Sequence, residues 1–309
     1  MGLQRGRLTR LISLLALLAL CGGCNDSVDG LAPVGGAQPS SVEMERFVRR
    51  LHLDLTGTPA SDEYLSDSVD ALEKAQDGAA AARAALADGL IESDEFGQVF
   101  VDELANRVYG GEDPNDRYDL LCGVTRDDDP SCATCGPPAD GDFCANCDCE
   151  RLTAIYADRQ AVRDAAADLT AGKATTAEVE RRFAESSALA GFSAPDALAD
   201  QLFELFLGRP AEADEQVNSQ AMIIGAIAAD RPAGLLFHRH GSNYQDLLDI
   251  VFQSEVYREA AASAVFARYL GRPAHLSEMA HFSAELDADR PDLRPVIRAV
   301  VSSQEYFEQ

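Results

Sequence analysis

The chain has 309 residues, 46% of them hydrophobic, and a formal charge of -26 from 52 acidic and 26 basic side chains. A surface this acidic repels nucleic acid and anionic lipid headgroups, so neither is expected as a partner. The absence of tryptophan and an aromatic content of 7% argue against a carbohydrate-stacking platform. The hydrophobic content is ample for a core in one large domain or two to three small ones.

The first 23 residues have the layout of a bacterial export signal. Arg5, Arg7 and Arg10 give a positive beginning without an acid, and a largely apolar run of ten residues follows at 11–20. This run is too short to cross a bilayer, which needs about 20 apolar residues. We therefore expect residues 1–23 to be a signal peptide, whose removal leaves a charge of about -29.

The signal ends at a candidate lipidation site. Gly22 and Gly23 precede Cys24 in the sequence LCGGC, which resembles a bacterial lipobox. The resemblance implies lipidation at Cys24, export, and anchoring to the outer membrane, on its periplasmic face or at the cell surface. The alternative is an ordinary secretory signal that leaves a soluble protein. Residues 24–41, rich in Gly, Pro and Ser, predict a flexible tether that reaches roughly 20–25 Å.

Three segments repeat in the same order along the chain. Each opens with an apolar-periodic stretch closed by Gly-x-Pro-Ala, at residues 51–60, 202–211 and 265–274. Each closes with an apolar pair and Ser-x-x-aromatic, at residues 90–96, 251–257 and 300–306. Repetition of this kind is typical of modular folds.

Helix formation explains the repeated residues. The apolar residues six and two positions before each glycine share one helical face. The glycine suits the left-handed residue that ends a helix, and the proline two residues later prevents continuation. The turn residues are Gly57, Pro59, Gly208, Pro210, Gly271 and Pro273. Acidic residues follow where a second helix would begin, and the closing serines Ser93, Ser254 and Ser303 suit helix N-caps.

These patterns predict an all-α protein of three related helical modules. The modules should pack together, because each has an apolar face that needs neighbours. We place them at residues 42–110, 191–260 and 261–309. A cysteine-rich irregular insert is expected at 111–150, after the first module, and a helical connector at 151–190.

Two families of unknown function resemble these modules. FVRRLHLDLTGTP, at residues 47–59, resembles the opening of the planctomycete cytochrome-associated domain, RR-x-Y-L-D-L-T-G-x-x-P, with His52 in place of Tyr. The LGRPA and S-x-x-Y elements resemble a helical extracellular repeat family. Neither family implies a catalytic residue. The first often accompanies covalent haem domains, but Gly136 and Asp148 follow the two CxxC motifs where a haem site needs histidine, so we expect no c-type haem.

The insert holds the six cysteines that remain once Cys21 is removed and Cys24 is acylated. They are Cys122, Cys132, Cys135, Cys144, Cys147 and Cys149. An exported, core-poor segment with six clustered cysteines favours three disulfides, in one of 15 possible pairings. The alternative is a zinc site, because the CxxC-x8-CxxC spacing brings four thiolates together.

The insert also carries candidate calcium ligands. These are Asp127, Asp128, Asp129, Asp140 and Asp142. A hard cation takes several oxygen ligands, although the spacing matches no EF-hand loop, so a solvated acidic loop is the simpler interpretation. His238 and His240 could likewise share a metal, with a surface pair as the simpler interpretation.

The chain carries no GxSxG nucleophile turn, no GxxxxGK[ST] phosphate loop and no HExxH metal helix. The leading hypothesis is therefore a non-enzymatic cell-envelope lipoprotein without a cofactor, serving as a helical scaffold or interaction module for an envelope protein partner. Two alternatives stay open. One is an accessory subunit of an exported haem-containing or hydrolase system, and the other is a divalent-cation-binding envelope protein.

Overall fold

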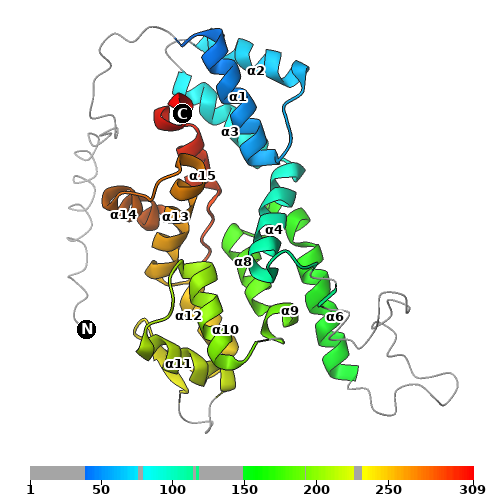
Figure 1. The fold of residues 1–309 in the computed structure, drawn as a ribbon, viewed down its shortest axis with the longest axis vertical. Helices are drawn as coiled ribbons and strands as arrows, with labels where there is room; N and C mark the ends of the chain where they lie inside the picture. Colours follow the sequence, from blue (N-terminus) through cyan, green and yellow to red (C-terminus); the bar gives the residue numbers. More distant parts are fainter. Residues whose placement is uncertain (1–38, 76–78, 114–115, 118–148, 192, 226–231) are drawn as a thin grey trace, which may run out of the picture. The chain divides into compact units, whose positions relative to one another are not determined.

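The folded body begins with a helix cap at Ser40. Its hydroxyl accepts from the backbone N–H of Glu43, and the Glu43 carboxylate accepts from the Ser40 backbone N–H at 2.7 Å. This reciprocal capping box starts a body that runs to Gln309. The computed structural model describes residues 39–75, 79–113, 116–117, 149–191, 193–225 and 232–309. Within these ranges the fold is all-α, with one two-stranded hairpin (Figure 1).

The first repeat is a group of four helices. They are α1 (Ser41–Thr56), α2 (Asp62–Ala75), α3 (Ala79–Ile91) and α4 (Asp94–Tyr109). Leu51 and Leu55, the apolar pair before the first turn glycine, are completely buried. The periodicity of α1 therefore gives the face that packs against the other helices of the group.

Four helices follow in the segment expected to be a connector. They are α6 (Cys149–Arg163), α7 (Ala165–Thr170), α8 (Thr176–Glu185) and α9 (Ser187–Ala190). Helix α7 packs on α4, and α8 contacts both α4 and α12 (Tyr244–Phe252). Val179 and Phe183 on α8 are completely buried. This segment therefore supplies central core residues between the first and second repeats.

The second repeat contains α10 (Pro195–Leu202), a π-helical turn η2 (Phe203–Leu207), α11 (Ala213–Ile224) and α12. Between α11 and α12 lies an antiparallel hairpin of β1 (Gly234–Leu236) and β2 (Arg239–Gly241). Phe237 and His238 form its two-residue turn, both at positive φ, which suits the twist of a hairpin. A Cβ on Gly234 would lie 2.5 Å from the Asn218 carbonyl, so glycine lets the hairpin approach α11. This hairpin was not predicted from the sequence.

The third repeat contains α13 (Glu255–Leu270), α14 (Leu276–Glu285), α15 (Arg294–Val301) and α16 (Gln304–Glu308). Helix α13 starts at the closing serine of the second repeat and ends at the turn glycine of the third. One helix therefore serves both repeats, and the boundary expected at 260/261 lies within it.

The first and third repeats interlock where α16 returns to α1 (Figure 1). The Phe47 ring contacts the rings of Tyr306 and Phe307, with centroids 6.0 and 5.3 Å away. The Arg50 guanidinium donates to the Tyr269 carbonyl at 2.8 Å and to the Gln309 side chain at 2.7 Å. The buried apolar residues from all three repeats belong to one hydrophobic cluster.

Candidate functional site

The three turn glycines share one backbone conformation. Gly57, Gly208 and Gly271 have φ values of 69°, 66° and 66°, in the left-handed region where a residue with a Cβ is disfavoured. Each ends its helix, and the Gly57 N–H donates to the Leu53 carbonyl at 2.9 Å. All three repeats therefore share the same helix-ending turn.

The closing serines are N-caps, as the sequence indicated. Ser93, Ser254 and Ser303 accept at Oγ from the backbone N–H three residues later, at 3.2, 2.9 and 3.2 Å. The residue that donates in each case is the buried aromatic of the motif. The serine thus fixes the start of a helix whose first turn carries a core ring.

The second and third turns each contain an arginine–glutamate clamp. Arg209 binds both carboxylate oxygens of Glu215, at 2.6 and 2.7 Å, and Arg272 binds those of Glu278, at 2.8 and 2.9 Å. The pKa of each carboxyl lies below its usual value, chiefly because the guanidinium donates hydrogen bonds to it. Arg272 also binds both oxygens of Glu305, which ties the third turn to α16.

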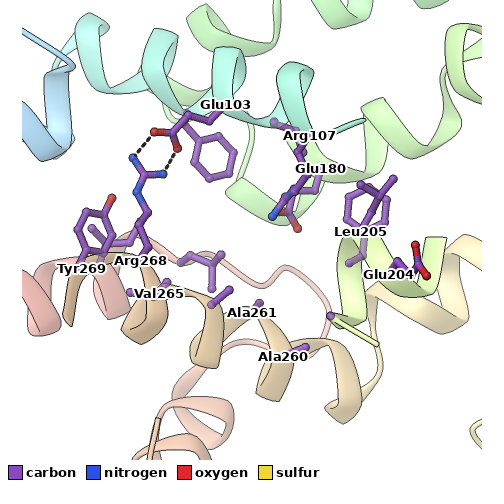
Figure 2. Close-up of a pocket in the computed structure, with 17 residues that line it drawn as sticks. Glu103, Arg107, Glu180, Glu204, Leu205, Ala260, Ala261, Val265, Arg268 and Tyr269 are labelled. Atoms are coloured by element: carbon purple, nitrogen blue, oxygen red, sulfur yellow. Dashed lines mark hydrogen bonds and ion pairs between the residues drawn. The ribbon is translucent and has the colours of Figure 1, made fainter. Parts of the chain in front are cut away.

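A cavity of about 360 Å³ lies between α4 and α13, each a 16-residue helix that starts at a serine cap and ends at a left-handed glycine. Leu104 on α4 and Val265 on α13 line it from opposite sides, and Leu293 and Ile297 add further apolar surface. Residues of η2 border it as well (Figure 2). Its walls are therefore mainly apolar and come from helices far apart in the sequence.

Two ion pairs connect the walls of this cavity. Arg268 on α13 binds both carboxylate oxygens of Glu103 on α4, one of them at 2.7 Å (Figure 2). Burial raises the pKa of the Glu103 carboxyl, and the neighbouring Arg268 opposes that rise. Arg107 on α4 donates to Glu180 on α8 at 3.0 Å.

Glu180 has a second partner deeper in the protein. The hydroxyl of Tyr257 donates to its other carboxylate oxygen at 2.8 Å. The Glu180 residue is only 7% exposed, so these two donors compensate the cost of burying its charge. Burial also raises the pKa of the Tyr257 hydroxyl, which therefore remains protonated and able to donate.

Tyr269 is the exception among the polar side chains at the cavity. It lies on α13, is 1% exposed, and its hydroxyl finds no hydrogen-bond partner among the described residues. Figure 2 shows this hydroxyl pointing from α13 toward the α4 side. Burial raises its pKa, so it is protonated and available as a donor. An unsatisfied buried hydroxyl costs about 1–3 kcal/mol.

The π-helical turn η2 distinguishes the second repeat at the cavity. The N–H of Gly208 donates to the Phe203 carbonyl five residues earlier, whereas that of Gly57 donates four residues back. The turn places Leu205 and Phe206 at the cavity border. Isolated π turns of this kind are frequent at functional sites.

Most residues that the sequence singled out for chemistry lie outside the described ranges. They are Cys24, Cys122, Cys132, Cys135, Cys144 and Cys147, and the acids Asp127, Asp128, Asp129, Asp140 and Asp142. Cys149 is the first residue of α6. Lipidation, disulfide formation and zinc or calcium binding at these positions stay predictions.

The histidine pair lies in the hairpin, with His238 in its turn and His240 paired with Leu235. Within the described part of the chain, no group of three or more His, Cys, Asp or Glu side chains is arranged to hold a metal ion. In the same part, no helix has the length and apolar character needed to cross a membrane.

Sequence reasoning missed the cavity residues. Glu103 and Arg268 are 165 positions apart, and neither belongs to a recognisable catalytic motif. One signal was present in the sequence. The residues two positions before the turn glycines are Leu55, Phe206 and Tyr269, so a hydroxyl stands in the third repeat where the other two have an apolar group.

Comparisons of this chain with protein-family models, with curated proteins and with solved structures found no match. Its function is therefore inferred from its own sequence and geometry.

Proposed function

We propose that this chain is a non-enzymatic, lipid-anchored protein of the bacterial cell envelope whose helical body docks onto another envelope protein. Cys24 in its lipobox-like context supports the anchor. The carboxylates Glu103 and Glu180 at the cavity are each engaged by an arginine, which supports a structural role for these groups rather than proton transfer.

An exposed apolar patch on α11 and β1 carries the docking proposal. Val217 and Ile224 are each 65% exposed, and their spacing of seven residues places them on one helical face. Leu235 on β1 is 45% exposed, and its backbone N–H donates to the Asn218 side chain, which holds β1 beside this part of α11. Grouped exposed apolar side chains are typical of protein interaction sites.

Metabolic labelling with palmitate tests the anchor. The wild-type chain, produced in a bacterial host, is expected to incorporate label and to fractionate with membranes. Cys24→Ser should lose the label, whereas Cys21→Ser is the matched control, because Cys21 is removed with the signal. Label that persists in Cys24→Ser would contradict lipidation at this residue.

Site-specific photo-cross-linking in the native envelope tests the docking surface. A benzoylphenylalanine at position 224 is expected to give one adduct of constant mass, and adding Val217→Asp should abolish that adduct. Position 53 is the control, because Leu53 is also half-exposed but lies on α1, away from the patch. Equal adducts at positions 224 and 53, or none at 224, would contradict the proposal.

A further inference from the structure

The cavity between α4 and α13 is a second site, separate from the patch on α11 and β1. We propose that it binds a small neutral molecule with an apolar body and one hydrogen-bond acceptor oxygen, which accepts from the Tyr269 hydroxyl.

The apolar body follows from the cavity walls. Leu104, Val265 and Ile297 present hydrocarbon from three helices, and Ala261 and Ala264 on α13 leave room beside them. A volume of about 360 Å³ is within the range of small-molecule sites. An apolar ligand would remove these surfaces from water on binding.

The neutral charge follows from the ion pairs. Arg268 and Arg107 already bind Glu103 and Glu180, so a charged ligand would have to break a pair or remain without a counter-charge. Glu204 also borders the cavity, and its carboxylate repels an anionic ligand in particular.

The acceptor oxygen follows from Tyr269. This side chain lines the cavity, is almost completely buried, and has no hydrogen-bond partner among the described residues. A ketone, ester, ether or hydroxyl oxygen on a ligand would accept from it. An apolar molecule of the same shape would leave the hydroxyl unsatisfied, so the oxygen distinguishes preferred ligands from plain hydrocarbons.

Three related probes separate these requirements. Valerophenone is neutral and carries one ketone oxygen, pentylbenzene lacks the oxygen, and 5-phenylvalerate is an anion. Each is titrated against the fluorescent neutral probe N-phenyl-1-naphthylamine bound to the full chain carrying Cys24→Ser, so that no attached lipid competes. We expect valerophenone to bind with a dissociation constant on the order of 10 µM, more tightly than the other two.

Two variants locate the binding. Tyr269→Phe should weaken valerophenone binding about three- to tenfold and leave pentylbenzene binding unchanged. Ala264→Phe fills the cavity and should weaken both by about tenfold or more, whereas Ala267→Phe, at an exposed position of the same helix outside the cavity, is the matched control. The melting temperature of Tyr269→Phe should not fall, since the hydroxyl removed has no partner among the described residues.

Several results would overturn the proposal. Binding of none of the probes would exclude the site, and unchanged binding in Ala264→Phe would place the probes elsewhere. An equal loss of both neutral probes in Tyr269→Phe would remove the role of the hydroxyl. Binding of 5-phenylvalerate as tight as that of valerophenone would contradict the requirement for a neutral ligand.

Discussion

The first turn and the two later turns reach the same backbone conformation with different side chains. Around Gly57, the Thr56 hydroxyl and the Thr58 carbonyl lie 2.9 and 2.8 Å from the Nδ1 atom of His52, whose ring contacts Tyr64 edge-on. Around Gly208 and Gly271, an arginine one residue after the glycine binds a glutamate seven residues after it.

This comparison shows which residues of the turn the fold requires and which residues can vary. The glycine is common to all three turns because the left-handed conformation requires it. In the first turn, Thr58 and Tyr64 stand where the others have arginine and glutamate, so the clamp is one solution among several. The clamped turns should respond to salt, because each has an ion pair at the two positions where the first turn has threonine and tyrosine.

Substitution of the turn glycines should have the largest effect on the free energy of unfolding. It tests whether the three turns tolerate a Cβ equally. A Cβ on Gly57 would lie 3.0 Å from a methyl carbon of Val99, whereas one on Gly208 or Gly271 would meet nothing within 4 Å. All three have positive φ, so alanine costs about 1–2 kcal/mol at each. We expect Gly57→Ala to lower the free energy of unfolding by about 1 kcal/mol more than Gly208→Ala in urea denaturation. Equal losses would mean that Val99 moves aside freely.

The two clamps should differ in how much they stabilise the fold, because Arg272 has a second carboxylate partner. Arg272 binds both Glu278 and Glu305, whereas Glu215 is the only charged side chain that Arg209 binds among the described residues. Arg272→Ala should therefore cost about 1–3 kcal/mol in thermal or urea unfolding, and Arg209→Ala about 1 kcal/mol. The double variant Arg272→Ala with Glu305→Ala would lose little beyond Arg272→Ala alone if the two side chains act through one another.

Acid should weaken the clamped turns. The Arg272 guanidinium and the His275 backbone N–H lower the pKa of Glu278 below 4.5, so this carboxylate stabilises the fold above that pH. Its contribution is lost as the pH falls below about 4.5 through the folded pKa. Glu278→Gln should therefore show a smaller decrease in unfolding free energy between pH 5 and pH 3 than the wild type, measured by urea denaturation.

Tyr64→Phe is the control for that acid effect. Burial raises the pKa of Tyr64 above its usual value near 10, so its hydroxyl stays protonated throughout the acidic range. Its pH profile between pH 3 and 5 should run parallel to that of the wild type. An unchanged slope in Glu278→Gln would show that other carboxylates determine the acid response.

The smallest effect is expected at Thr58, the first-turn counterpart of the arginines. Its side chain is exposed and its hydroxyl lies 3.1 Å from that of Thr56. Thr58→Ala should change the free energy of unfolding by less than about 0.5 kcal/mol. A loss as large as that of Arg209→Ala would show that the first turn depends equally on its side chains.

The repeated turns and serine caps were predictable because they depend on neighbouring residues. A glycine followed by proline two positions later, or a serine before an aromatic helix start, specifies local backbone geometry wherever it occurs. The all-α class follows from the same signals. The hairpin lacked such a signal, because its turn residues Phe237 and His238 are not the asparagine or glycine that usually mark positive φ.

The cavity could not be predicted in this way. Its walls meet only after α4, α8 and α13 pack together, and the ion pairs across it join residues 73 and 165 positions apart. The π turn at η2 also lacked a sequence signal, since the spacing before Gly208 matches that before Gly57 and Gly271. Tyr269 could be recognised as a polar replacement within the repeat, but its lack of a partner appears only in three dimensions.

Because α13 belongs to two repeats, we expect the second and third repeats to unfold together. A pulling force or a protease cannot separate the second repeat from the third without breaking a continuous 16-residue helix. The backbone amides of both repeats should therefore exchange with deuterium in one cooperative step. In evolutionary terms, a copied segment that runs from one left-handed glycine to the next would add a repeat while keeping every shared helix intact.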